Sequence, residues 1–173
     1  MHKALATGSR RSARSLVMDI DRNGMLVLSQ EECILRLGDR GVGRVAVSIG
    51  ALPAIFPVNY ATCAGDVYFR AAAGTKLAAA TRNAVVAFEI DDLDRLSHTG
   101  WSVQVVGPAA VVDDPDDIYR LRSLPLVRWI GAAPDTLVRI SSDLVSGREI
   151  CSHSVDECRR VHGALINAGR GFR

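Results

Sequence analysis

Arg70, Thr75 and Lys76 are the residues of this chain whose types and spacing best suit binding of an anion. The alternating run 66–70 predicts a strand that ends in Arg70, and Gly74-Thr75-Lys76 opens an alanine-rich helical run. The first amides of a helix have no partner within it and attract negative charge. These residues therefore predict a phosphate-sized anion site. The alternative is an ordinary strand-turn-helix corner with two surface cations.

A second group of chemically useful residues is Pro57-Val58-Asn59, in a strand predicted over 52–60. Pro53 and Pro57 cannot donate to a neighbouring strand, so this strand should be an edge, be bulged, or run beside a ligand. The Asn59 amide both donates and accepts hydrogen bonds, which suits a flat polar heterocycle. A proline-blocked edge that resists aggregation is the alternative.

Trp101 and Ser102 open another predicted strand, with Trp129 and Arg139 further along the chain. A tryptophan beside polar groups can border a ligand, although packing in the core is the commoner role of Trp. Both readings stay open from the sequence.

Cysteine and histidine gather near the C-terminus, at Cys151, His153, Cys158 and His162. Their spacing is not a familiar zinc pattern, so we predict no metal site. No histidine lies in a nucleophile motif, and no Walker or dinucleotide-binding glycine motif is present. The sequence therefore identifies no catalytic residue.

The elements that must position these groups are mostly short strands. Ser29 and Glu32 fit a capping box for a helix over 29–38, which a short apolar run, 25–28, precedes. The other predicted elements are strands over 43–49, 52–60, 67–70, 84–91, 100–112 and 136–145, helices over 76–82, 116–123 and 155–167, and an acidic loop from Asp91 to Asp94. Consecutive strands with short turns favour an antiparallel sheet or small barrel.

Composition predicts one globular domain, because 48% of the 173 residues are hydrophobic. We assign 1–24 to a mobile basic tail, 25–150 to the domain and 151–173 to a C-terminal helix and tail. The basic ends carry no interleaved aromatic residues, so we expect no nucleic-acid partner. No apolar run is long enough to span a membrane, and no secretory signal is visible. Four cysteines without a C-x-x-C pair favour a reducing, cytoplasmic location.

Residues 29–150 resemble the pyridoxamine 5′-phosphate oxidase-like family of flavin-binding split barrels. The match is closest to its small flavin- or deazaflavin-dependent oxidoreductases. Five segments carry the resemblance in order: GVGRVAVSIGALPAIFPVNYA (41–61), DVYFRAAAGTKLAAA (66–80), VVAFEIDDLD (85–94), TGWSVQVVGPAAVV (99–112) and LVRISSDLVSGREI (137–150).

The resemblance implies a mainly β fold, a six-stranded antiparallel split barrel with short flanking helices. It also implies a homodimer with two cofactor sites at the subunit interface. FMN is the expected cofactor, with 5-deazaflavin as an alternative and haem as a weaker one. The implied cofactor-binding residues are Pro57, Val58 and Asn59 at the isoalloxazine edge, Phe69, Arg70, Thr75 and Lys76 at the ribityl chain and phosphate, Ser102 as a polar contact, and Trp129 and Arg139 from the partner subunit.

Three departures from the family pattern qualify this expectation. In relatives an Arg-Lys pair holds the phosphate, but Thr75-Lys76 stands at that place in this chain. Arg70 is therefore the candidate for the second cation at the phosphate. Pro108 interrupts a strand where relatives often carry a basic residue, and residues that bind the oxidase's phosphorylated substrate have no clear counterparts. We therefore expect a flavin- or deazaflavin-dependent oxidoreductase of unknown small-molecule substrate that works by hydride transfer. A non-catalytic carrier of flavin, deazaflavin or haem is the alternative, and an interaction protein using the basic tails is a third.

Overall fold

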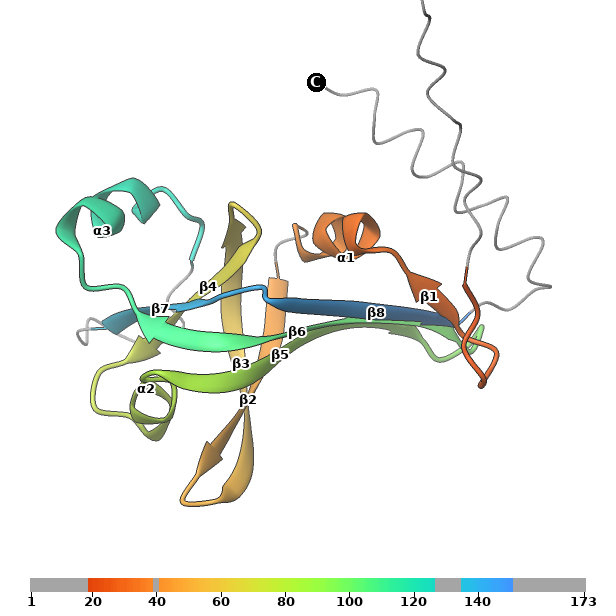
Figure 1. Ribbon diagram of the computed structural model, residues 1–173, viewed down its shortest axis with the longest axis horizontal. Helices are drawn as coiled ribbons and strands as arrows, with labels where there is room; N and C mark the ends of the chain where they lie inside the picture. The colour runs from red at the N-terminus through yellow and green to blue at the C-terminus, as the bar shows by residue number, and fades with distance from the viewer. Residues whose placement is uncertain (1–18, 39–40, 127–134, 151–173) are drawn as a thin grey trace, which may run out of the picture.

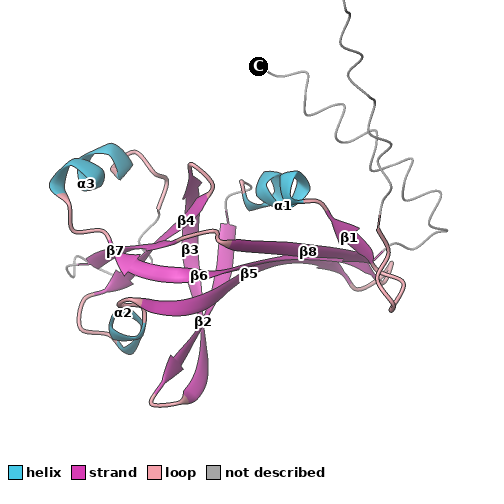
Figure 2. Cartoon of the chain, in the orientation of Figure 1, coloured by secondary structure: helices cyan, strands magenta, loops and turns pink. Residues whose placement is uncertain are grey.

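The computed structural model describes residues 19–38, 41–126 and 135–150. Within these ranges one antiparallel sheet dominates, with short helices around it, as Figures 1 and 2 show. The elements are β1 (Leu26–Leu28), α1 (Gln30–Leu37), β2 (Gly41–Ile49), β3 (Leu52–Cys63), β4 (Asp66–Ala72), α2 (Lys76–Ala80), β5 (Ala84–Asp94), β6 (Thr99–Val111), α3 (Pro115–Leu121), β7 (Asp135–Ile140) and β8 (Leu144–Ile150). The predicted mainly β class is confirmed.

The sheet closes on itself because β6 pairs with three neighbours. The strand order is β1-β8-β6-β5-β2-β3-β4-β7, and an additional pairing joins β7 to β6. Strands β2 to β7 therefore form a ring, which confirms the expected six-stranded split barrel. The first half of β6 pairs instead with β8, and β8 pairs with β1. These strands and the far end of β5 form an arm that extends from the barrel (Figure 1).

The single strand predicted over 136–145 is wrong, because the chain forms two strands there. Residues 141–143 leave the ladder and turn towards the β3–β4 connection. The Ser142 hydroxyl donates to the Gly65 carbonyl (2.7 Å), and the Ser142 amide donates to Asp66 (3.2 Å). The chain resumes as β8 along the other half of β6. These local bonds, which alternation of apolar residues does not reveal, divide the strand.

Two other expectations about strands also change. The predicted acidic loop from Asp91 to Asp94 is part of β5, which pairs with β6 as far as Thr99. The turn comes later, where Asp94 accepts hydrogen bonds from Leu96 and Ser97. Pro108 does not interrupt β6, since it pairs with Val85 and its carbonyl accepts from the Ser141 amide.

Helix α1 begins as predicted and covers one face of the arm. Ser29 is the N-cap, and the reciprocal bonds of a capping box join it to Glu32. The buried face of the helix presents Cys33 and Leu37 to the core. Arg36 lies 4.7 Å from the ring centroid of Trp101 and pairs with Glu149 on β8. The helix is therefore fixed to the arm by apolar, cation–π and ionic contacts.

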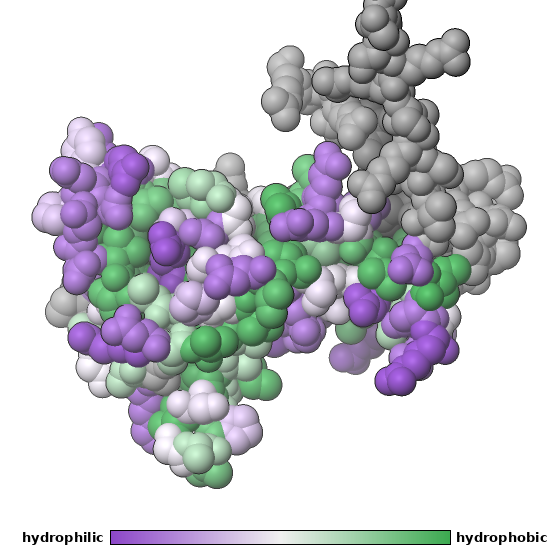
Figure 3. Space-filling model, viewed as in Figure 1, coloured by the Kyte–Doolittle hydropathy of each residue, from purple (hydrophilic) through white to green (hydrophobic). Residues whose placement is uncertain are grey.

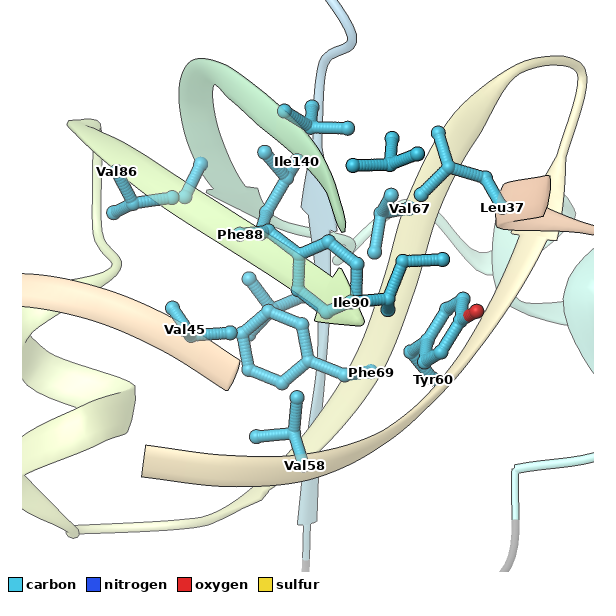
Figure 4. Packing of buried hydrophobic residues seen from close by; sticks show 14 of the residues in the cluster. Leu37, Val45, Val58, Tyr60, Val67, Phe69, Val86, Phe88, Ile90 and Ile140 are labelled. Atoms are coloured by element: carbon cyan, nitrogen blue, oxygen red, sulfur yellow. The ribbon is translucent and has the colours of Figure 1, made fainter. Parts of the chain in front are cut away.

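The core fills the barrel with aromatic and branched side chains. Figure 4 shows Phe69 and Phe88 gathered with their neighbours inside the ring. The rings of Tyr60 and Phe88 meet edge-on, with centroids 4.9 Å apart. A Cβ at Gly43 would lie 2.2 Å from the Phe88 ring, so the glycine makes room for it. The packed interior leaves the outer faces of the strands for binding.

The outer face carries an apolar row that crosses five strands. Directly paired residues share a face of the sheet, and the register links Ile55, Ala46, Ala87, Val106 and Leu144 in turn. Both ends of the row are about two-thirds exposed, at 67% for Ile55 and 68% for Leu144. Figure 3 shows apolar residues gathered in a band across the face in view.

The predicted boundary between the N-terminal tail and the domain can be compared with the structure. Residues 19–24, which we assigned to the tail, form a turn in which Ile20 pairs with Leu26. The rest of the basic tail and the predicted helix over 155–167 lie outside the described residues. No helix in the described ranges is long and apolar enough to cross a membrane.

Candidate functional site

The strands β3 and β4 separate at one end, and the predicted site residues Asn59 and Arg70 lie at this fork. β3 pairs with β2 from Leu52 to Tyr60, but it pairs with β4 only from Tyr60 to Cys63. The last pair before the strands diverge is Tyr60 with Phe69. Asn59 and Arg70 are the next residues on the two sides. We call this place the β3–β4 fork, defined by Pro57, Asn59, Arg70, Thr75 and Lys76.

The fork explains the two prolines of β3. Pro53 and Pro57 both lie in the part of the strand that pairs with β2 alone. A missing N–H costs least where one side of a strand has no partner. The expectation of an edge is therefore confirmed. Pro57 is exposed and Asn59 is half-buried, and alternation along the strand directs both away from the core.

Thr75 shapes the connection that leads from the fork into α2. Its hydroxyl donates to the Ala72 carbonyl (2.8 Å) and accepts from the Ala78 amide (3.2 Å). This hydroxyl is already used as an N-cap, so Thr75 offers an anion mainly its backbone. Helix α2 has five residues, and a helix this short has a weak macrodipole. The exposed side chain of Lys76 is the main source of positive charge at this end.

Arg70 is held by an acid that the sequence reading missed. Its Nη1 lies 2.9 Å from Oδ1 of Asp135 on β7, and both side chains are partly buried. A second ion pair crosses the same strands, between Arg139 and Asp66 at 3.6 Å. The register places Tyr68 opposite Arg139, between the two pairs. The sequence did carry a signal for this acid. The alternation Asp135-x-Leu137-x-Arg139 puts the Asp135 carboxylate on the same face of the strand as Arg139.

Val58 and Phe69 lie in the core. Val58 is 5% exposed and Phe69 is fully buried. Their side chains fill the barrel, so only their backbone groups could meet a ligand at the fork. Packing, rather than ligand chemistry, accounts for the residue types at these two positions.

Ser102 lies away from the fork, in a shallow pocket on the arm. Its cross-strand neighbours are Asp91 on β5 and Arg148 on β8. The pocket has a volume of about 310 Å³, and its lining includes these three residues and Trp101. Asp91 pairs with Arg44, and Arg148 lies 3.3 Å from Asp21. Because β2 and β5 separate β6 from β3, one chain does not bring Ser102 to the fork.

Some predicted residues cannot be placed. Trp129 and the cluster of Cys151, His153, Cys158 and His162 lie outside the described residues. Among those described, no group of three or more His, Cys, Asp or Glu side chains is arranged to hold a metal ion.

Comparisons with known proteins agree on one family. A family model described as pyridoxamine 5′-phosphate oxidase matches residues 29–149. The uncharacterized protein Rv0080 of Mycobacterium tuberculosis is 36% identical over 155 residues, covering 87% of this chain and 98% of that protein.

Two solved structures resemble this chain in sequence and fold. An FAD-binding protein from Mycobacterium smegmatis is 34% identical, with a TM-score of 0.64, and the match covers 72% of this chain and 99% of that one. A protein of unknown function from Corynebacterium diphtheriae is 32% identical, with a TM-score of 0.63 and coverages of 73% and 98%.

Proposed function

The chain belongs to the pyridoxamine 5′-phosphate oxidase family, and from that premise we propose that it binds a flavin at the β3–β4 fork. The observation that carries the proposal is the fork itself. The part of β3 that carries Pro57 and Asn59 pairs with β2 but not with β4, and the chain runs from Arg70 at the end of the β3–β4 pairing to Lys76. A flat heterocycle with a phosphorylated tail needs this combination of an edge and a cationic end.

Each residue of the fork has a distinct role in this proposal. The edge at Pro57 and the Asn59 amide orient the ring of the flavin. Lys76 and the amides around Thr75 bind its phosphate, and Asp135 keeps the Arg70 guanidinium turned to the same side. When bound, a flavin supplies hydride and electron transfer, while the protein positions it and tunes its surroundings. The reaction is therefore hydride transfer with a small-molecule substrate.

Charge at the fork bears on which flavin the chain binds. The Asp135 carboxylate offsets Arg70, so Lys76 is the cation for which no ion pair is found among the described residues. FMN carries a phosphate monoester, whereas FAD carries a diphosphate bridge of lower charge per phosphate. FMN remains the first candidate, and the M. smegmatis relative, an FAD-binding protein, adds FAD to 5-deazaflavin and haem as ligands to be compared.

We also propose that two copies of the chain complete the site. The apolar row from Ile55 to Leu144 crosses the outer face of the sheet, and its two end residues are about two-thirds exposed in the single chain. Burying such a face is the usual driving force for a stable dimer. A second copy could bring Ser102 or Arg139 to a flavin that the first copy holds.

Binding is tested by titrating flavin-free protein with FMN, FAD, 5-deazaflavin and haem and following absorbance and fluorescence. We expect Lys76→Ala and Arg70→Ala each to weaken flavin binding about 10- to 100-fold, the loss of one charge-assisted phosphate contact. Arg82→Ala is the matched control, since Arg82 is an exposed cation after α2, and its affinity should equal that of the unaltered protein. Equal affinities in all three variants would reject the fork.

A non-catalytic flavin carrier is the second candidate. It requires the same fork, so turnover separates the two. Protein loaded with reduced flavin is mixed with small quinones and nitroaromatic acceptors, and reoxidation is compared with that of free flavin. An enzyme accelerates the transfer to at least one acceptor, whereas a carrier slows all of them.

A further inference from the structure

The pocket that contains Ser102 is bordered by an apolar row at the outer end of the arm. Leu93, Gly100 and Ile150 form this cross-strand row, and all three line the pocket. Because Gly100 has no side chain, the row leaves a gap between two exposed apolar side chains. We call this row, together with Glu89 of the same pocket, the arm groove. The pocket volume of about 310 Å³ is at the lower limit for small-molecule sites, so side chains of a chain segment suit it better than a cofactor.

The charges at this pocket leave one carboxylate without a countercharge. The two arginines there, Arg44 and Arg148, are already paired with Asp91 and Asp21. Glu89 is half-buried, and none of the residues that the structure describes forms an ion pair with it. An occupant that brings a positive charge and apolar side chains therefore complements the groove.

The chain itself supplies such a segment directly beyond the groove. The last described residue is Ile150, in the groove wall, and the chain continues to residue 173. Residues 159–173 carry four arginines and no acid. In the helix that the sequence predicts over 155–167, the apolar residues fall on one stripe at 3.6 residues per turn. They are Val155, Cys158, Val161, Leu165 and Ile166.

We propose that the predicted helix over 155–167 docks on the arm groove of its own chain, with Cys158 against Leu93 and Arg159 beside Glu89. The apolar stripe then covers the gap in the row, and the guanidinium supplies the missing countercharge. Docking needs neither a flavin nor a second copy of the chain.

The connection between the groove and the helix has a suitable length. Leu93 lies two strands away from Ile150, which is about 10 Å, and residues 151–154 can span up to about 14 Å. A tether this short keeps the helix at a high local concentration beside the groove. Helix α1 lies on the other face of the arm, where its Cys33 approaches Gly147, and leaves the groove face uncovered by α1 (Figure 1).

Docking also decides which residue a second copy could bring to a flavin. Ser102 lies in the wall of the pocket that the docked helix covers. Arg139, on β7, is not part of this wall. Of the two, Arg139 is therefore the one that stays available to a flavin held by the other copy.

The test is disulfide trapping in the full chain. Cys63→Ser and Cys151→Ser leave Cys158 as the reactive thiol, since Cys33 is buried. Leu93→Cys then places a partner thiol in the groove, and diamide oxidises the pair. We expect a disulfide within one chain, identified by its linked peptides and by the mass of a single chain on a non-reducing gel. The N-terminal segment 1–18 holds no cysteine and cannot give this product.

Leu35→Cys is the matched control for trapping. Leu35 lies on α1, at the other face of the arm, and is 60% exposed, against 58% for Leu93. The Leu93→Cys protein should form its disulfide at least about tenfold faster, because docking holds Cys158 on the groove side.

Charge reversal tests the second contact. In the Leu93→Cys protein, Glu89→Lys and Arg159→Glu should each slow trapping about two- to fivefold, as expected for loss of one partly exposed ion pair. The two changes together should restore the rate. Arg160→Glu makes the same change in net charge on the side of the predicted helix away from the stripe, and it should leave the rate unchanged.

Three results would overturn the proposal. Equal trapping rates in Leu93→Cys and Leu35→Cys would show that the helix does not prefer the groove. A disulfide that joins two chains would make a second copy the occupant. Equal effects of Arg159→Glu and Arg160→Glu would reject the placement of the helix against Glu89.

Discussion

At the scale of single residues, the buried thiol of Cys33 makes the fold sensitive to alkali. Burial on the inner face of α1, with Glu32 nearby, raises the pKa of Cys33 above its ordinary value of 9.0. The unfolded chain loses this proton first, so the unfolded state becomes favoured as the pH rises past 9.0 towards the folded pKa. The contribution is fully present below pH 9.0 and is lost above it.

We therefore predict that the urea midpoint of the unaltered protein falls as the pH rises past 9.0. Cys33→Ala should be less stable at pH 8 by about 1 kcal/mol, because it leaves a small cavity, but its midpoint should fall less steeply with pH. Tyr68→Phe serves as a reference, since that phenol acts only above its ordinary pKa of 10.0. Parallel pH profiles for Cys33→Ala and the unaltered protein would contradict this account.

Residue types alone predicted the candidate site only in part. Arg70, Thr75 and Lys76 could be grouped because they are close in the sequence, and the prolines indicated an edge because a missing N–H is a local property. Alternation placed Asp135 on the same face of its strand as Arg139, but its pairing with Arg70 depends on β7 lying beside β4, which no local pattern encodes. That ion pair changes the charge available to a ligand, so the chemistry of the fork needed the fold.

At the scale of elements, β6 depends on a close backbone approach at Gly107. Here the strand changes its neighbour from β8 to β7, and a Cβ at Gly107 would lie 1.9 Å from the Ser141 carbonyl oxygen. Backbone atoms on both sides leave no flexible side chain to move away. The glycine is therefore what allows one strand to serve both the barrel and the arm.

Gly107→Ala should lower the free energy of unfolding by about 3 kcal/mol, as expected for overpacking against a fixed backbone. Gly41→Ala, at the start of β2, is the matched control, because nothing lies within 4 Å of its added Cβ. It should change stability by less than about 0.5 kcal/mol. Urea unfolding of both variants measures the difference, and equal stabilities would show that the junction can relax.

Elements with local signals were predicted well, and those that need distant partners were not. The capping box at Ser29 predicted the start of α1, and apolar patterns with the turns between them predicted β2 to β6. The division into β7 and β8 was missed because it rests on Ser142 binding the β3–β4 turn, nearly eighty residues away in the chain. Ring closure likewise follows from pairing of β6 with β7, which no local pattern encodes.

At the scale of the whole molecule, the apolar row decides whether the chain works alone. Ile55, Ala46, Ala87, Val106 and Leu144 follow one another across five strands, and the residues at both ends of the row are exposed. A face of this kind exposed to water favours association, and symmetry lets one patch meet its own copy. The family resemblance implies a homodimer, and this row is the feature of the single chain that supports it.

Placing a charge at the centre of the row should therefore prevent association. Ala87→Arg puts a guanidinium on the middle strand, where a twofold partner would bring a second one close to it, and desolvation and repulsion then oppose contact. We expect the unaltered protein to sediment as a dimer and the variant, at the same concentrations, as a monomer. Its far-ultraviolet spectrum should stay the same, because the side chain points out of the barrel.

Leu96→Arg is the control for this prediction, since Leu96 is 94% exposed at the β5–β6 turn and lies outside the row. It should leave the sedimentation coefficient unchanged. Flavin affinity is then measured on both variants. If the second copy contributes to the site, Ala87→Arg should weaken flavin binding about tenfold or more, although it leaves the fork residues of its own chain unchanged. A monomeric Ala87→Arg protein with full flavin affinity would place the whole site in one chain, and an unchanged dimer would show that the row is not the interface.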